Sequence, residues 1–200
     1  EVRKDEESVE IPFYGYIDIS SENGRLVVKH RNAEYVKAVP YDVPIIGDGN
    51  HIVNTLRLWS AEPASVYPDN AFEYHRNLRE ISSMLYPNDD TEEGKILRLK
   101  QQYFFVSAGI KSAIRRHKEI FKSCKNLDKK LCFHINDTHP ALIVPELMRI
   151  LVDEEQIPWD DAWNITKNCC AYTNHTILAE ALEKWPVHLF KRLLPRIFTI

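Results

Sequence analysis

Two short stretches of the sequence combine histidine with Asn, Asp and Thr, and these residue types could do chemistry together. Residues 136–140 read NDTHP and residues 173–176 read TNHT, and each stretch follows an apolar, β-rich run. In α/β proteins, ligands bind beyond the carboxyl ends of the parallel strands, where such loops meet. If the two strands are neighbours, we expect Asp137, His139 and His175 to converge on the floor of one cleft.

Three kinds of chemistry suit this cluster. Asx and Thr side chains are preferred helix caps, which would make these residues structural: Asp137, Thr138, Asn174 and Thr176. Histidine with carboxylate could instead hold zinc or manganese in a hydrolase, with these ligands: His134, Asp137, His139 and His175. Neutral His, Asn, Asp and Thr would also supply the mixed donors and acceptors that sugar hydroxyls require. The residues alone leave these alternatives open.

The second half of the chain alternates predicted strands and helices, which would position both loops. Strands are predicted at 131–135 and 169–172, and helices at 140–153, at 158–167 and from near Ile177. The short apolar strands are typical of a buried parallel sheet. This order predicts a doubly wound α/β layer.

The first half of the chain is β-rich. Four strands are predicted, at 13–19, 25–30, 35–39 and 52–59. Turn signals separate them, among them Asn23–Gly24 and a loop at 40–49. Residues 68–70 (PDN) then signal the start of a helix at 71–85, whose polar faces indicate that it projects from the body.

An acidic stretch, residues 88–94 (NDDTEEG), precedes the strongest predicted helix, which extends to Phe121. Apolar residues such as Ile110 and Ile114 recur along it at helical spacing. Carboxylates in the first turn complement the positive end of the helix dipole. We therefore interpret the acidic stretch as helix capping.

Composition excludes several classes of protein. The 44% hydrophobic and 28% charged residues are typical of a folded globular domain rather than a disordered chain. With a net charge of -3 and no apolar run of membrane-span length, neither nucleic acid nor a membrane is expected as a partner, and we interpret the chain as cytoplasmic. The four cysteines form no C-x-x-C pair and are expected to be buried free thiols. The charged start without methionine and the apolar end suggest a piece of a longer protein.

Several long strings, in this order along the chain, resemble the α-glucan phosphorylases, the family of glycogen, starch and maltodextrin phosphorylases. They are PYDVP at 40–44, VNTLRLWS at 53–60, YPND at 86–89, EGKILRLKQQY at 93–103, NDTHP at 136–140, PELMR at 145–149, AYTNHT at 171–176 and EALEKWPVH at 180–188. Because these combinations are long and chemically unusual, accidental similarity is improbable.

The resemblance implies a single piece of the N-terminal domain of a two-domain, GT-B type glycosyltransferase. The piece would comprise a β-rich part at 1–60, a projecting helix at 69–86 through which family members form homodimers, and a Rossmann-like α/β part at 88–200. The family moves a terminal α-1,4-linked glucosyl unit from a glucan or maltooligosaccharide to inorganic phosphate, giving glucose 1-phosphate. Its pyridoxal phosphate is held by a lysine of the C-terminal domain, which is absent here, so no cofactor is expected in this chain.

The resemblance also implies roles for particular residues. His175 would contact the glucosyl unit, Asp137 and His139 would line the pocket beside its anomeric centre, and Thr176 would lie toward the acceptor. A mobile loop gating the entrance would consist of Asn88, Asp89, Asp90, Thr91, Glu92 and Glu93. At Asp90 the family commonly has an asparagine that hydrogen-bonds the sugar, so this chain keeps the acceptor oxygens there and loses the amide donor.

The cleft loops lack the groups that phosphate needs. The chain has no glycine-rich anion loop and no cluster of Lys and Arg around residues 136–140 and 173–176. We therefore expect this chain alone to be inactive, with the missing remainder of the polypeptide supplying the phosphate-binding groups. The alternatives are a metal-dependent hydrolase using the cluster at 134–139 with His175, and an interaction module that assembles through the helix at 71–85 and the apolar end at 193–200.

Overall fold

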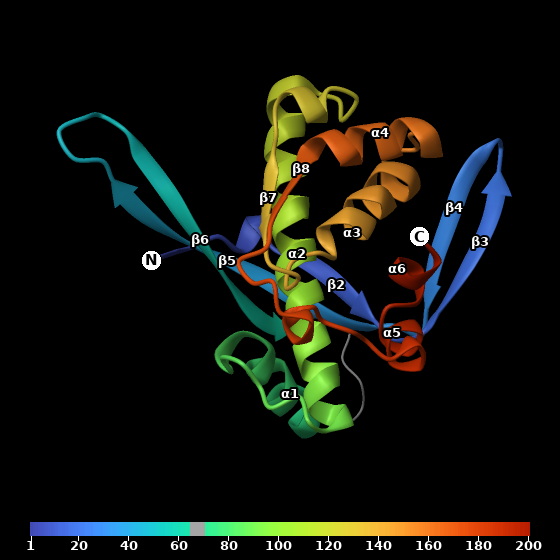
Figure 1. Ribbon diagram of the computed structural model, residues 1–200. Helices are drawn as coiled ribbons and strands as arrows, with labels where there is room; N and C mark the ends of the chain where they lie inside the picture. The colour runs from blue at the N-terminus through green and yellow to red at the C-terminus, as the bar shows by residue number, and fades with distance from the viewer. Residues whose placement is uncertain (65–70) are drawn as a thin grey trace. The chain divides into compact units, whose positions relative to one another are not determined.

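A computed structural model describes residues 1–64 and 71–200, with side chains for residues 1–64 and 77–200. The predicted helix start at 68–70 lies outside the described residues. Figure 1 labels the helices and strands of the chain, which divides into two compact units. The first comprises Glu1–Pro12 and Glu34–Phe104, and the second comprises Phe13–Ala33 and Phe105–Ile200. Both contain helices and strands, so the protein is a mixed α/β protein with several small sheets.

The first unit is built on a four-stranded sheet centred on one long strand. This strand, β5 (Glu34–Ile46), pairs with β1 (Val2–Arg3), β2 (Val9–Phe13) and β6 (Val53–Pro63). The antiparallel β5–β6 ribbon is in register from Val36 opposite Pro63 to Ile46 opposite Val53. A short 3-10 helix, η1 (Asp5–Glu7), connects β1 to β2.

The predicted loop at 40–49 is wrong, because β5 continues through both of its prolines to Ile46. The carbonyl oxygen of Pro40 accepts a hydrogen bond from the Lys4 amide, at 2.9 Å, on the β1 side of the strand. Since the N and C=O of one strand residue point to the same side, the missing N–H of Pro40 also faces away from β6. Pro44 has the same parity, so neither proline removes a hydrogen bond from the β5–β6 ladder.

The predicted helix at 71–85 is confirmed as α1 (Ala71–Ser83). Leu78 and Ile81 are buried, and the Ala61 amide of β6 donates a hydrogen bond to Ser82 Oγ at 3.1 Å. Leu85, predicted on the apolar side of this helix, lies beyond its end and is 83% exposed. The long predicted helix is α2 (Glu92–Phe121), which contributes residues to both units.

The second unit contains a separate antiparallel ribbon, β3 (Tyr16–Glu22) and β4 (Arg25–Arg31). The predicted turn is confirmed, because Asn23 and Gly24 both have positive φ, as the favoured two-residue hairpin turn requires. The predicted continuous strand at 13–19 is interrupted by Tyr14 and Gly15, which also have positive φ. A Cβ atom on Gly15 would overlap the Arg31 carbonyl oxygen, so a side chain there is excluded.

Residues 124–169 of the second unit pack against the C-terminal half of α2 (Figure 1). Strand β7 (Phe133–Asn136) pairs in parallel with β8 (Cys170–Thr173), as predicted. The helices are α3 (Ile143–Arg149), extended by a π-helical turn η3 (Ile150–Glu154), and α4 (Trp159–Cys169). The rest are η2 (Leu127–Lys129), η4 (Ala179–Ala181), α5 (Val187–Leu193) and α6 (Pro195–Thr199). The core shared by α2, α3, η3 and α4 includes these buried side chains: Ile110, Ile114, Leu147, Leu151 and Ile165.

Two helix starts in the second unit differ from prediction. The helix predicted from Pro140 begins at Ile143, because residues 138–143 form tight turns in which Ala141 and Ile143 donate to Thr138 and Pro140. The helix predicted from near Ile177 is wrong, since this segment holds only the short η4. Ile177 is fully exposed and Leu178 is 57% exposed, so the packed face that stabilises a short helix is absent here.

No described helix has the length and apolar character needed to span a lipid bilayer.

Candidate functional site

The parallel pairing of β7 and β8 brings the ends of the two predicted loops together. The pair closes with Asn136 opposite Thr173, and the Asp137 amide then donates to the Thr173 carbonyl at 2.8 Å. The His175 amide donates to Asp137 Oδ1 at 3.0 Å. The predicted convergence of Asp137 and His175 is therefore confirmed.

Asp137 has a left-handed backbone, with φ of 59°. Among non-glycine residues, Asp and Asn adopt this conformation most readily, because their short polar side chains bond locally. Here the bend follows directly after β7 and allows the carboxylate to accept the amide of the neighbouring loop. The sequence signal for this junction is an aspartate placed immediately after a strand.

The ring of His175 also meets the end of β7. Its Nε2 atom lies 3.3 Å from Asn136 Oδ1, and with that oxygen as acceptor Nε2 carries the hydrogen. The Nδ1 atom is then left as an acceptor. Because the side chain is exposed, its Nδ1 atom can accept a hydrogen bond from a hydroxylated ligand while Nε2–H bonds to Asn136.

A third segment, which sequence reasoning did not connect with these loops, also reaches the site. Thr138 Oγ1 donates to Glu183 Oε2 at 3.1 Å, which ties the loop after β7 to the segment after η4. Glu183 lies in the string EALEKWPVH, but no spacing rule connects it to residues 136–140. Asn136, as the partner of the His175 ring, was missed for the same reason.

The helix-capping interpretation is wrong for the second loop, although its side chains do bond to the local backbone. Asn174 Nδ2 donates to the Thr176 carbonyl at 2.7 Å, and Thr176 Oγ1 accepts the Leu178 amide at 3.1 Å. These are the short side-chain-to-backbone bonds that Asn and Thr form in turns. They stabilise a turn and not a helix, since no helix begins at this point.

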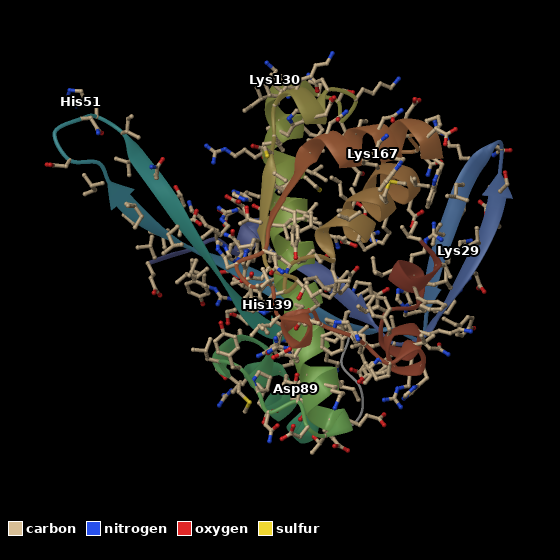
Figure 2. The ribbon with its side chains drawn as sticks, in the orientation of Figure 1. Lys29, His51, Asp89, Lys130, His139 and Lys167 are labelled. Atoms are coloured by element: carbon tan, nitrogen blue, oxygen red, sulfur yellow. The ribbon has the colours of Figure 1, made fainter. Side chains whose placement is uncertain are left out.

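His139 lies on the same loop as Asp137 and is half-buried (Figure 2). Among the described residues, its ring makes no hydrogen bond or ion pair. The structure therefore places His139 at the carboxyl end of β7 but joins it to neither Asp137 nor His175 by a direct contact.

The metal-ligand interpretation is wrong. Within the parts of the chain that the structure describes, no three His, Cys, Asp or Glu side chains are arranged to hold a metal ion. The His134 ring is exposed and its Nε2 atom lies 2.7 Å from Thr173 Oγ1. His134 lies within β7, where successive side chains point to opposite faces of the strand pair. Its ring therefore belongs to a face of the pair and not to the loop that follows Asn136.

The acidic stretch before α2 belongs to the first unit and caps that helix, as predicted. Thr91 Oγ1 accepts the Gly94 amide at 3.1 Å, and Glu92 and Glu93 occupy the first turn. The threonine is thus the N-cap, and the carboxylates face the positive end of the helix dipole.

The backbone of the same stretch is held by local contacts, while its side chains stay exposed. The Asp90 amide donates to Asn88 Oδ1 at 2.9 Å. Lys95 Nζ donates to the carbonyl oxygens of Asp89, at 2.6 Å, and of Asp90, at 3.3 Å (Figure 2 labels Asp89). The Asp90 carboxylate is left to solvent, where it could meet a ligand.

Comparison with known proteins gives a consistent family. A family model described as carbohydrate phosphorylase matches residues 1–200. Glycogen phosphorylase of Bacillus subtilis is 54% identical over 100% of this chain and 25% of its own length. The human muscle form is 46% identical over 98% of the chain and 25% of its own length, and the bovine brain form is 47% identical over 93% and 24%. The chain spans about a quarter of the length of these relatives, and it belongs to the carbohydrate phosphorylase family.

Proposed function

We propose that this chain is part of an enzyme that transfers a terminal α-1,4-linked glucosyl unit from a glucan or maltooligosaccharide to inorganic phosphate. The product is glucose 1-phosphate. The observation that carries the proposal is the junction of Asp137 and His175, which gathers hydrogen-bond donors and acceptors at the carboxyl edge of a parallel strand pair. The type of reaction is inferred from membership of the carbohydrate phosphorylase family.

In this proposal the loop residues recognise the sugar. His175 contacts the glucosyl unit, with a ring that is held by Asn136 through Nε2–H and offers Nδ1 as an acceptor to a hydroxyl group. Asp137 and His139 line the pocket beside the anomeric centre, and Thr176 lies toward the acceptor. The bond between Thr138 and Glu183 holds the first of these loops in place.

The exposed stretch 88–93 is proposed to gate the entrance to the sugar pocket. Its side chains are free of the core, while the Thr91 cap and Lys95 fix both ends of the turn. Because Glu92 and Glu93 belong to the first turn of α2, movement of this stretch would involve residues 88–91 together with that turn. Asp90 would accept hydrogen bonds from sugar hydroxyls, without the amide donor that asparagine would add.

Pyridoxal phosphate and inorganic phosphate are assigned to another part of a longer polypeptide. Loops 136–140 and 173–176 contain the Asp137 carboxylate and no lysine or arginine. A carboxylate disfavours a phosphate beside it, because like charges repel in a site of low dielectric. The residues of this chain therefore do not fit the cofactor, and we propose that they supply sugar-binding groups only.

We further propose that the chain forms the latter part of the N-terminal domain of a GT-B type enzyme that works in the cytoplasm. Residues 1–60 would be its β-rich part and residues 88–200 its Rossmann-like part. The segment 69–86, which includes α1, would carry the homodimer contact.

Replacing His175 tests the proposed role of the junction. In the full-length protein, His175→Ala is expected to lower kcat/KM for phosphorolysis of maltoheptaose by about 100-fold, because the charged or polar groups of the sugar site lose a partner. The control is His188→Ala, which removes an exposed histidine on α5 and should leave kcat/KM unchanged. Equal activity of the two variants would contradict the proposal.

A further inference from the structure

His175 is held at two points, its backbone amide and the Nε2 atom of its ring. The amide donates to Asp137 Oδ1 at 3.0 Å, and Nε2 lies 3.3 Å from Asn136 Oδ1. Among the described residues, Nδ1 has no hydrogen-bond partner, so this nitrogen is the part of the ring left for a ligand. The direction in which Nδ1 points therefore depends on the contact with Asn136.

Asn136 is itself fixed by strand pairing. It is the last residue of β7 and lies opposite Thr173 of β8, and the amide of the next residue donates to the Thr173 carbonyl at 2.8 Å. Within the described part of the chain, its side chain bonds to the His175 ring alone. A side chain at the end of a paired strand is placed more precisely than one on a loop. Asn136 is thus well placed to hold the ring.

The amide oxygen of Asn136 favours one of the two forms of a neutral imidazole. With the ring hydrogen on Nε2, the pair gains a hydrogen bond, whereas a hydrogen on Nδ1 would leave lone pairs of Nε2 and Oδ1 facing each other. The Asp137 carboxylate does not compete, because it accepts the backbone amide of His175. Both side chains of the pair are exposed, so a ligand seated on the ring would shield their contact from water and strengthen it.

We propose that Asn136 is a positioning residue that sets the polarity of sugar recognition. It holds the His175 ring with the acceptor Nδ1 toward the sugar, so the sugar group bound there must be a hydroxyl that donates. This inference rests on the proposed sugar-binding role of His175. A group that can only accept, such as an ether oxygen, a carbonyl or fluorine, would face Nδ1 with its own lone pairs and be rejected.

The test compares hydroxyl and fluorine at the same position of the substrate. The probes are maltopentaose and its analogues with fluorine in place of the hydroxyl at position 3, 4 or 6 of the terminal glucosyl unit. Fluorine is close to a hydroxyl in size and cannot donate a hydrogen bond. Position 2 is left unchanged, because fluorine there slows glucosyl transfer itself. The measured quantity is the ratio of kcat/KM for phosphorolysis of maltopentaose to that of each analogue, in the full-length protein.

His175→Ala identifies the hydroxyl that the ring contacts. At one position, we expect fluorine to lower kcat/KM by about 30-fold in the unchanged protein, and this ratio should fall to about threefold in His175→Ala. Both substrates are measured on the same preparation, so a loss of folded protein cancels in the ratio.

Asn136→Ala and Asn136→Ser should also reduce the ratio at that position to about threefold. In both variants the ring can carry its hydrogen on Nδ1 without opposing an acceptor, and the serine hydroxyl can donate to Nε2. A residue that only stabilised the fold would lower kcat/KM for both substrates alike and leave the ratio unchanged. The matched control is Asn164→Ala, which removes an exposed asparagine of α4 and should keep the ratio of about 30-fold.

Two results would overturn the inference, and they differ in what they say of the proposed function. If both Asn136 variants keep the ratio of the unchanged protein while His175→Ala loses it, Asn136 does not set the ring, although His175 still contacts the sugar. If His175→Ala changes neither kcat/KM for maltopentaose nor the ratio at any position, the proposed sugar-binding role of His175 fails, and the role of Asn136 fails with it.

Discussion

Glu146 is a fully buried carboxylate that ties α3 to the C-terminal half of α2. Its Oε1 accepts a hydrogen bond from Ser107 Oγ at 2.7 Å, and its Oε2 accepts one from Arg149 Nε at 2.7 Å. Burial by itself raises the pKa of this carboxyl, but the adjacent Arg149, with Lys111 and Ser107, outweighs burial and leaves the pKa below its ordinary value. The carboxylate is therefore ionised and held by several partners at neutral pH.

Replacing this carboxylate should destabilise the second unit in a pH-dependent way. Glu146→Gln removes one partner of a buried ion pair, and we expect it to lower the free energy of unfolding by about 3 kcal/mol at pH 7. A lowered folded-state pKa contributes stability above the ordinary carboxyl pKa and loses it as pH falls through the folded value. The difference between variant and unchanged chain should therefore shrink in acid.

Urea unfolding at pH 7 and at acid pH measures this difference. Glu154→Gln is the matched control, because Glu154 also pairs with Arg149 but its side chain is 47% exposed. It should change stability by less than about 1 kcal/mol. A loss as small for Glu146→Gln as for the control would show that the buried pair does not stabilise the unit.

The four cysteines differ in exposure, and only part of the expectation of buried thiols is confirmed. Cys124 and Cys169 are buried, Cys170 is half-buried and Cys132 is exposed. Desolvation raises the pKa of Cys124 to about 11 and that of Cys169 to about 12. Because the thiolate is the reactive form, these two thiols should be inert near neutral pH.

Titration with a chromogenic disulfide reagent at pH 8 measures how fast each of the four thiols reacts. We expect one thiol, Cys132, to react rapidly in the folded chain and all four to react after unfolding. Cys132→Ser should remove the rapid phase and leave the rest unchanged. A rapid phase that persists in that variant would place the reactive thiol elsewhere.

At the scale of elements, a single side chain holds the β3–β4 ribbon to the turn before α4. Gln156 Oε1 accepts the Leu26 amide and its Nε2 donates to the Leu26 carbonyl, both at 3.0 Å. The side-chain amide thus pairs with β4 as a neighbouring strand would. The ribbon has no sheet partner among the described strands, so this contact matters for its position within the unit.

Gln156→Ala should therefore loosen the ribbon while leaving the core intact. We expect a loss of about 1–2 kcal/mol in the local opening free energy of β3 and β4, one small increment for each lost hydrogen bond. Amide hydrogen exchange followed by mass spectrometry measures it. Gln156→Glu keeps the acceptor for the Leu26 amide and loses the donor, so its opening free energy should lie between those of the unchanged chain and Gln156→Ala. Equal protection of β3 and β4 in the unchanged chain and both variants would contradict this role.

The elements that could be predicted from sequence are those with strong local signals. Asn23–Gly24 predicted a hairpin turn, and the acidic stretch at 88–94 predicted the start of α2. The prediction of a loop at 40–49 was wrong because a strand tolerates a proline whose nitrogen faces away from the paired strand. Which way that nitrogen faces depends on the strand pairing, which local sequence does not give. The helix from near Ile177 was wrong because helix stability depends on a packed face, which sequence periodicity cannot supply.

At the scale of the whole molecule, the site follows from topology more than from any one motif. Asp137 and His175 were expected to meet because both follow strands that read as parallel neighbours, and β7 and β8 are such a pair. The contact of Thr138 with Glu183 depends on how a long irregular segment returns to the site. No periodicity or capping rule describes such a return, so that part of the site could not be predicted.

The proposed division of groups between this chain and another part of a longer polypeptide gives a further prediction. The purified 200-residue chain should show no phosphorolysis of maltoheptaose and no absorbance of a pyridoxal aldimine. Its sugar-pocket loops hold a carboxylate and lack cations for phosphate. Glucose 1-phosphate formation and the absorption spectrum measure both properties, and either activity or a bound aldimine in the chain alone would refute this division.

The most direct measurement is a crystal structure of the full-length protein bound to maltopentaose. We predict an ordered terminal glucosyl unit with a hydroxyl within hydrogen-bonding distance of the His175 ring and its anomeric carbon beside Asp137. Ordered maltopentaose elsewhere, with none against residues 136–140 and 173–176, would contradict the account.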